Sequence, residues 1–202
     1  TIAAIAGQRS WVADAFALDG RFGIYVNSIE AIRTLPPGSW VFFVHWSDMV
    51  PADVLEKYRC VGFHMTDLPF GRGGSPLQNL IRRGIKKTVL TSYQMTDQLD
   101  AGPIYMKEFD IDIDEASAHD IYSNMAIIAV DMAYKIFTKE IAPVAQDGAV
   151  THFVRLRPED SEIRGIESID RLYDHIRMHD AEGYPAAFLK HGGERGRQLA
   201  IL

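Results

Sequence analysis

Short apolar runs alternate with segments of helical spacing as far as residue 141, and this alternation restricts the fold more than any other feature of the chain. Continuous apolar runs are typical of strands that are buried on both faces of a sheet. A regular succession of strands and helices predicts an α/β fold with a wound, mostly parallel sheet. The predicted strands are 2–6, 22–26, 40–44, 60–64, 88–95 and 104–109, and the predicted helices are 10–18, 28–34, 51–58, 77–83 and 116–141.

The pattern changes after Gly148, where the regular alternation stops. We therefore predict a main domain at 1–148 and a small α+β C-terminal appendage at 149–202 that packs on it. The predicted elements of this appendage are a strand at 150–156, a helix at 167–178 and two short strands at 184–189 and 198–202.

Composition narrows the class of protein. The net charge of −6 argues against a general nucleic-acid binder, which usually carries a basic face. Cys60 is the only cysteine, so the chain has no disulfide framework, and we interpret Cys60 as a buried, inert thiol of a cytoplasmic protein. No apolar run approaches the roughly 20 residues that a membrane-spanning helix needs, so we expect no membrane partner.

Two histidines have a spacing that is known from zinc sites. His175 and His179 lie four residues apart on the predicted helix, but no third ligand is obvious and the H-E-x-x-H pattern is absent. Asp97 and Asp100 share a loop that has no matching acid nearby in sequence. We therefore expect the two histidines to lie on a solvated helix face, and we expect no metal.

The segment 62–105 carries the candidate chemistry. His64 and His45 lie at the carboxyl ends of two predicted strands, where ligands bind in wound sheets. A loop rich in glycine and proline, with Arg72 in it, follows His64, and Asp100 lies in a later L-D-A-G-P turn. A histidine base and a carboxylate on separate loops suit acyl transfer to an amine, because the second group can orient the base.

The loop G-R-G-G-S-P precedes the helix at 77–83, and N–H groups at such a position favour an anion. The loop matches neither the dinucleotide fingerprint nor the P-loop pattern, and the first strand has no glycine fingerprint, which argues against a Rossmann-type oxidoreductase. Tyr184 is a further candidate for contact with a base or a sugar, although packing of the appendage explains it at least as well. We predict substrate contacts at Arg72, Gly73, Gly74, Ser75 and Tyr184.

These motifs resemble those of the formyltransferases that use N10-formyltetrahydrofolate. That family includes methionyl-tRNA formyltransferase, the glycinamide ribonucleotide enzyme and the sugar N-formyltransferases, and this chain looks most like the last group. The family pattern is Asn-x-His, then Leu-Pro, Arg-Gly, Pro and a later Leu-Asp-x-Gly. The match covers residues 40–110 well and the C-terminal part more loosely. The matching residues are His64, Leu68, Pro69, Arg72, Gly73, Pro76, Leu99, Asp100 and Gly102.

The resemblance implies a Rossmann-like formyltransferase core that transfers a formyl group directly to an amine. It implies that His64 assists proton removal and helps to stabilise the oxyanion, and that Asp100 orients His64. It also implies N10-formyltetrahydrofolate as the co-substrate, held largely by backbone groups and without a metal. The residues assigned to this pterin pocket are Phe43, Val44, Tyr93, Met95, Leu99 and Asp100.

The chain departs from the family pattern at Gly62, where the family has its catalytic asparagine. Losing one oxyanion donor typically costs about 10²–10³ in rate, so the departure matters unless another group compensates. We hypothesise that His45, or a backbone N–H near it, supplies the missing donor. The alternative is a catalytically inactive folate- or nucleotide-binding module, against which the presence of His64 and Asp100 argues.

Size and charge predict the acceptor. The resemblance implies that a methionyl-tRNA formyltransferase has a longer chain with a separate C-terminal barrel and basic surfaces that face tRNA, whereas this chain is shorter and acidic. We therefore expect a nucleotide-linked amino sugar as the acceptor and no nucleic-acid partner. The alternatives are methionyl-tRNA, a purine precursor or a peptide amine. Because homodimers are usual among the sugar-modifying members, we also expect a homodimer.

Overall fold

A six-stranded sheet forms the centre of the computed structural model, which describes residues 2–191 and 197–201. Its strands are β1 (Ala3–Ala6), β2 (Tyr25–Val26), β3 (Trp40–Phe43), β4 (Arg59–His64), β6 (Lys87–Gln94) and β7 (Ile104–Asp112). The strand order is β2-β1-β3-β4-β6-β7. The first four strands are parallel, whereas β6 and β7 are antiparallel to their neighbours. The predicted α/β class with a mostly parallel sheet is confirmed.

Both faces of this sheet are covered by helices, as the alternation along β3 shows. Trp40 and Phe42 belong to one apolar cluster, while Val41 and Phe43 belong to a second one. Successive side chains of a strand point to opposite faces, so a strand with every residue buried needs cover on both sides. The helices are α1 (Ser10–Asp19), α2 (Ile29–Arg33), α3 (Ala52–Lys57), α4 (Pro76–Arg82) and α5 (Ala118–Lys139). The first cluster includes residues of α1, α4 and α5, and the second includes residues of α2 and α3.

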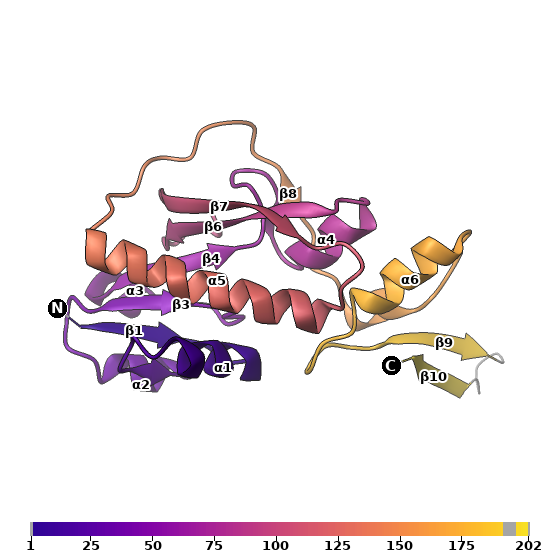
Figure 1. The fold of residues 1–202 in the computed structure, drawn as a ribbon, viewed down its shortest axis with the longest axis horizontal. Coiled ribbons are helices and arrows are strands. Elements are labelled where there is room, and N and C mark those ends of the chain that lie inside the picture. The colour runs from indigo at the N-terminus through magenta and orange to yellow at the C-terminus, as the bar shows by residue number, and fades with distance from the viewer. Residues whose placement is uncertain (1, 192–196, 202) are drawn as a thin grey trace.

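The longest helix, α5, runs along one side of the sheet (Figure 1). It begins after Ser117, whose hydroxyl oxygen accepts a hydrogen bond from the N–H of Asp120 at 3.1 Å and so satisfies one of the unpaired donors at the helix start. Its bounds agree with the predicted helix at 116–141 to within two residues at each end. Among the helices that the structure describes, none combines the length and the hydropathy that a bilayer crossing requires.

The connection after α5 passes over the top of the view in Figure 1 and brings the chain back to the glycine-rich loop. There, the short strand β8 (His152–Phe153) pairs in parallel with β5 (Arg72–Gly73). The strand predicted at 150–156 is therefore shorter than expected, because only two of its residues find a partner strand. The predicted boundary at 148 stays a prediction.

The C-terminal elements lie together at one end of the molecule (Figure 1). The elements are η1 (Pro158–Ser161), α6 (Ile169–Arg177), β9 (Ala187–His191) and β10 (Arg197–Ile201). The strands β9 and β10 form an antiparallel hairpin, and their bounds overlap the two predicted C-terminal strands. Residue 202 of the second predicted strand lies outside the described part of the chain.

Candidate active site

His64 and Asp100 meet at the end of β4, as the sequence predicts. His64 Nδ1 lies 3.6 Å from Asp100 Oδ2, and each side chain is 7% exposed. This separation is that of an ion pair and exceeds the usual length of a hydrogen bond. His64 Nε2 lies 2.7 Å from the carbonyl oxygen of Gly71, which only accepts, so Nε2 carries a proton. In the neutral ring, Nδ1 therefore holds the lone pair and faces the buried carboxylate.

The carboxylate of Asp100 is held from two sides. Oδ2 accepts a hydrogen bond from the N–H of Gly73 at 2.8 Å, and Oδ1 accepts one from the hydroxyl of Tyr93 at 2.7 Å. The backbone of Asp100 has a φ of 52°, in the left-handed region that aspartate tolerates better than most residues. This turn carries the side chain back to the glycine-rich loop, so the two predicted loops form one site.

Gln146 connects these loops to the chain after α5. Its Oε1 accepts hydrogen bonds from Arg72 Nε and Nη2 at 3.2 and 2.7 Å, and its Nε2 donates to the carbonyl oxygens of Asp100 and Gly102 at 2.8 and 2.9 Å. Because this partner is a neutral amide, it does not compensate the charge of Arg72, which stays suited to an anion. Sequence reasoning missed Gln146, which lies in a connection that has no motif.

The predicted substrate loop, residues 71–76, packs against β8 and the residues that follow it. Gly73 has a φ of 110°, and a side chain on it would clash with the carbonyl oxygen of Phe153. Ser75 also has a positive φ, of 50°, and its hydroxyl oxygen accepts a hydrogen bond from the N–H of Leu156 at 3.0 Å. Gly74 faces Arg155, because a Cβ on Gly74 would lie 2.9 Å from Arg155 Cα. The contacts of this loop with substrate stay a prediction.

His45 belongs to a separate group of aromatic side chains. It has a φ of 49°, and its Nδ1 accepts a hydrogen bond from Trp11 Nε1 at 3.0 Å. Burial, together with the charge of Arg9, lowers the pKa of His45 to about 3. The ring is therefore neutral with its proton on Nε2. Its centroid lies 4.2 Å from that of Tyr122, which in turn stacks on Tyr184 at 5.4 Å.

The residues assigned to the pterin pocket differ in exposure. The side chains of Phe43, Val44 and Tyr93 are buried, so only their backbone groups are suited to contact with a ligand. Leu99, in contrast, is 69% exposed. Next to these residues, Trp46 packs edge-on against Phe43 at 5.3 Å, and its buried Nε1 has no hydrogen-bond partner among the described residues. Sequence reasoning did not single out Trp46.

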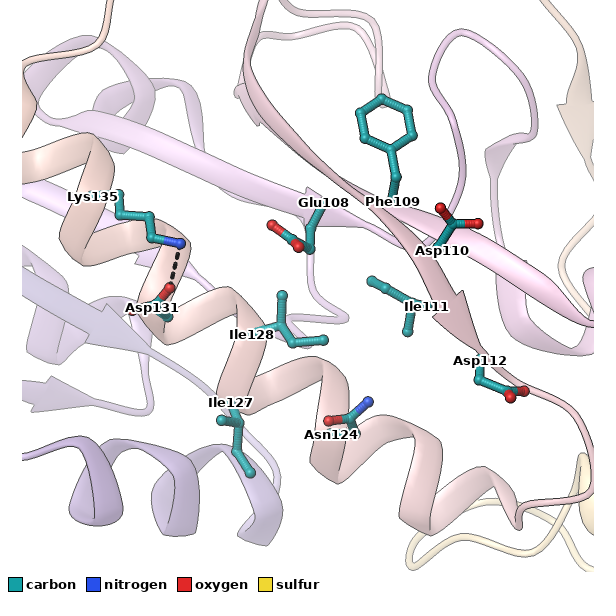
Figure 2. Close-up of a pocket in the computed structure, with 10 residues that line it drawn as sticks. All are labelled: Glu108, Phe109, Asp110, Ile111, Asp112, Asn124, Ile127, Ile128, Asp131 and Lys135. Atoms are coloured by element: carbon teal, nitrogen blue, oxygen red, sulfur yellow. Dashed lines mark ion pairs between the residues drawn. The ribbon is translucent and has the colours of Figure 1, made fainter.

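A surface hollow of about 510 Å³ lies away from these groups, between β7 and α5 (Figure 2). Its Lys135 forms an ion pair with Asp131 at 2.7 Å, one turn apart on α5. None of the predicted site residues lines it, and it contains no histidine. This hollow therefore does not mark the candidate site. The lining residues are Glu108, Phe109, Asp110, Ile111, Asp112, Asn124, Ile127, Ile128, Asp131 and Lys135.

The prediction of a solvated face at His175 and His179 is wrong for His179, which is 4% exposed. The chain turns after α6, and this turn places His179 inward, with its ring 5.1 Å from that of His175. Burial, and then the charge of His175, lowers the pKa of His179 to about 4. Within residues 2–191 and 197–201, no group of three or more side chains is arranged to hold a metal ion.

Comparison with known proteins assigns the family. The family model described as the C-terminal domain of methionyl-tRNA formyltransferase matches residues 158–196. The solved structure of the methionyl-tRNA formyltransferase from Clostridium thermocellum is 36% identical to this chain, has a TM-score of 0.87, and the match covers 100% of this chain and 97% of that one. The chain belongs to the methionyl-tRNA formyltransferase family. The predicted resemblance is thereby confirmed.

Several curated relatives are longer than this chain. The methionyl-tRNA formyltransferase of Thermodesulfovibrio yellowstonii is 27% identical over 158 residues, which are 75% of this chain and 51% of that protein. The chain thus spans about half the length of the curated relatives that it matches. HypX from Aquifex aeolicus, solved in complex with tetrahydrofolic acid, shares the fold at 15% identity, with a TM-score of 0.76 over 94% of this chain and 36% of that one. A solved sugar N-formyltransferase from Shewanella and a solved 4-N formyltransferase from Francisella tularensis share it at 12% and 14% identity, with TM-scores of 0.71 and 0.72.

These relatives correct the expected partner. The relatives with the higher identities are methionyl-tRNA formyltransferases, which contradicts the prediction of a nucleotide-linked sugar and no nucleic acid. That prediction relied on a short chain and an acidic total charge, but a total charge does not show how the charges are distributed. His152, Arg155 and Arg157 are exposed on the segment around β8, and Arg83 lies over the ring of Phe153 at 4.4 Å. The predicted homodimer and cytoplasmic location stay predictions.

Proposed function

We propose that this chain carries the active site of a folate-dependent formyltransferase whose acceptor is the amino group of methionyl-tRNA. The observation that carries the reaction is the buried pair of His64 and Asp100, which the carboxyl end of β4 and the loop between β6 and β7 bring together. The acceptor is supported by the 36% identity to the Clostridium thermocellum protein, which extends over 100% of this chain.

The residues at the end of β3 fit a reduced folate. The indole Nε1 of Trp46 is a buried donor without a partner among the described residues, and a pterin ring offers acceptor atoms for such a group. Leu99 presents an exposed apolar side chain directly before Asp100. N10-formyltetrahydrofolate, when bound, supplies the formyl group. We expect the backbone of Phe43 and Val44 to face the ring.

In the proposed reaction, His64 takes a proton from the acceptor amine while the amine nitrogen bonds to the formyl carbon. Asp100, 3.6 Å away, stabilises the protonated ring. His45, neutral and with its proton on Nε2, donates to the formyl oxygen as negative charge develops on it. The proton held by His64 then passes to the folate nitrogen when the bond from that nitrogen to the formyl carbon breaks.

Basic side chains beside the glycine-rich loop support a nucleic-acid acceptor. Arg155 faces Gly74, and Arg157 follows it on the same exposed segment. Arg72 is held by Gln146 in the same loop. Lysine and arginine contacts to phosphates supply most of the affinity of a protein for RNA or DNA and make binding dependent on salt.

The test is an assay with N10-formyltetrahydrofolate and methionyl-tRNA. The expected result is N-formylmethionyl-tRNA, seen as a mass gain of one formyl group on the released methionine, together with tetrahydrofolate. Free methionine, uncharged tRNA and a nucleotide-linked amino sugar are the matched alternative acceptors, and the His64→Ala variant is the negative control. Folate binding without turnover on any of these acceptors contradicts the proposal and supports the inactive binding module that Gly62 suggests.

A further inference from the structure

Gly62 lies two residues before His64 on β4, and it faces Tyr93 on the neighbouring strand β6. A Cβ built on Gly62 would lie 2.7 Å from Tyr93 Cζ and 2.8 Å from the Tyr93 hydroxyl oxygen. Atoms of this size need well over 3 Å, so the tyrosine ring occupies the space that a side chain at position 62 would take. We refer to these two residues as the Gly62–Tyr93 pair.

The backbone does not require glycine at position 62. Gly62 lies inside β4, and its φ is outside the left-handed region, so alanine or asparagine is free to adopt the same conformation. The glycine is therefore required by space alone. Conversely, the position of the Tyr93 ring is available only because residue 62 has no side chain.

The Tyr93 hydroxyl is directed at the catalytic carboxylate. It donates to Asp100 Oδ1 at 2.7 Å, while Asp100 Oδ2 accepts from the N–H of Gly73 and faces His64 Nδ1. Burial, and then the negative charge of Asp100, raises the pKa of Tyr93 well above its ordinary value. The hydroxyl thus stays protonated, and its single proton is committed to Asp100.

We propose that Tyr93 is a positioning residue of the formyl-transfer site and that Gly62 is present to admit it. This inference rests on the function proposed above. Tyr93 acts through Asp100: its hydroxyl and the N–H of Gly73 hold the two carboxylate oxygens, so that Oδ2 stays turned toward His64. Removal of the hydroxyl leaves Oδ1 as a buried acceptor without its donor, and the carboxylate is then free to rotate away from the ring.

The first test is the Tyr93→Phe variant, which removes one oxygen and keeps the ring. We expect kcat to fall about 10- to 100-fold, the size of a lost hydrogen bond to a charged group, with the Kd for tetrahydrofolate unchanged. The matched control is Tyr58→Phe, because Tyr58 lies directly before the start of β4, away from the His64 end of that strand, and its buried hydroxyl donates to the carbonyl oxygen of Leu35. That control should keep kcat. A Tyr93→Phe variant with kcat within twofold of wild type overturns the proposal.

The second test is a double-mutant cycle in the pair. Gly62→Asn alone should lower kcat at least 10-fold, because the new side chain displaces Tyr93 from Asp100. Tyr93→Ala alone should lower it as well, because Asp100 loses its donor. The combined Gly62→Asn and Tyr93→Ala variant should be more active than either single variant, because the asparagine amide then enters the vacated space. Losses that simply multiply in the double variant overturn the proposal.

Wild type, the two single variants and the double variant also distinguish a failure of this inference from a failure of the proposed function. If the wild-type protein transfers no formyl group to any acceptor, the proposed function fails. Urea unfolding then tests whether the Gly62–Tyr93 pair depends on space as inferred. Gly62→Asn should lower the urea midpoint when Tyr93 is present and lower it much less in the Tyr93→Ala background, because the clash is gone. Equal shifts in the two backgrounds overturn the inference.

Discussion

His64 and His45 lie at the ends of neighbouring parallel strands, in opposite surroundings. His64 faces a buried carboxylate on one side and a carbonyl oxygen on the other. His45 accepts a hydrogen bond from Trp11, packs against Tyr122 and feels the positive charge of Arg9. The first ring has its lone pair on Nδ1, which faces the carboxylate, whereas the second is kept neutral with its proton on Nε2.

In the proposed reaction, this difference gives one residue type two separate purposes. A base needs a lone pair and a partner that tolerates the positive charge, and Asp100 supplies that partner. A donor to a developing oxyanion needs a fixed N–H, and the hydrogen bond from Trp11 fixes it on His45. Because the two roles differ, separate substitutions at His64 and His45 should have different consequences.

Replacing His64 should have the largest effect. We expect His64→Ala to lower kcat by about 10²–10⁴, the usual range for loss of a general base, with little change in the Kd for tetrahydrofolate. Steady-state kinetics with methionyl-tRNA measure the first quantity, and isothermal titration measures the second. A His64→Ala variant that turns over at the wild-type rate would show that this ring is no base and would remove the contrast between the two histidines.

Replacing His45 should have the next largest effect. If its Nε2–H donates to the oxyanion, His45→Ala lowers kcat by about 10²–10³, and His45→Gln, which keeps a neutral N–H donor, retains more of the rate. Circular dichroism checks that the aromatic group around Trp11 and Tyr122 stays folded. Unchanged kcat in His45→Ala removes the donor hypothesis and leaves His45 as a packing residue.

The features that the sequence predicted are those with local signals. The apolar run at 40–44 predicts its strand, and the helical spacing of apolar residues along α5 predicts that helix. The ends of two parallel strands place His64 and His45 at the same edge of the sheet. Gln146 gave no such signal, because its role depends on where a long connection returns. Tyr93 was assigned to the pterin pocket, yet its hydroxyl contacts Asp100, since the register of β4 against β6 is not visible in either strand alone.

The acceptor prediction failed for a related reason. A net charge of −6 is a sum over the chain, whereas phosphate recognition depends on where the cations lie. His152, Arg155 and Arg157 follow one another along a single exposed segment, which a sum does not reveal. The same limit applies to His179, whose inward direction is set by a turn after α6 and not by its four-residue spacing from His175.

The arginines beside the His64 loop should affect binding more than turnover. We expect Arg155→Ala to raise the KM for methionyl-tRNA several-fold and to leave kcat nearly unchanged. The slope of log KM against log salt concentration should fall by about 0.7 to 0.9, the value for the loss of one phosphate contact. Lys57→Ala, at the end of α3 and just before the start of β4, is the matched control with the same change in charge. Equal effects of the two variants would indicate a general charge effect.

The smallest effect concerns pH and a third histidine. His179 has a folded-state pKa of about 4, below its ordinary 6.5, because of burial and His175. Between these values the unfolded chain binds a proton that the folded chain does not, so stability falls as the pH falls from about 6.5 to about 4. The slope is at most about 1.4 kcal/mol per pH unit for this one group. Urea unfolding of wild type and His179→Gln at pH 7 and pH 5 measures it. An equal pH dependence in both proteins would contradict the prediction.

The Gly62–Tyr93 pair also constrains how such a site changes over generations. A substitution that adds a side chain at position 62 meets the tyrosine ring, while loss of the tyrosine first leaves a void and an unsupported Asp100. If residue 62 changes first, the intermediate protein has a steric clash, and if Tyr93 changes first, it has a cavity. Neither position is therefore free to change without the other. A sequence pattern that requires asparagine two residues before the histidine rejects this chain. A pattern that considers positions 62 and 93 together accepts asparagine at position 62 as well as glycine at position 62 with tyrosine at position 93.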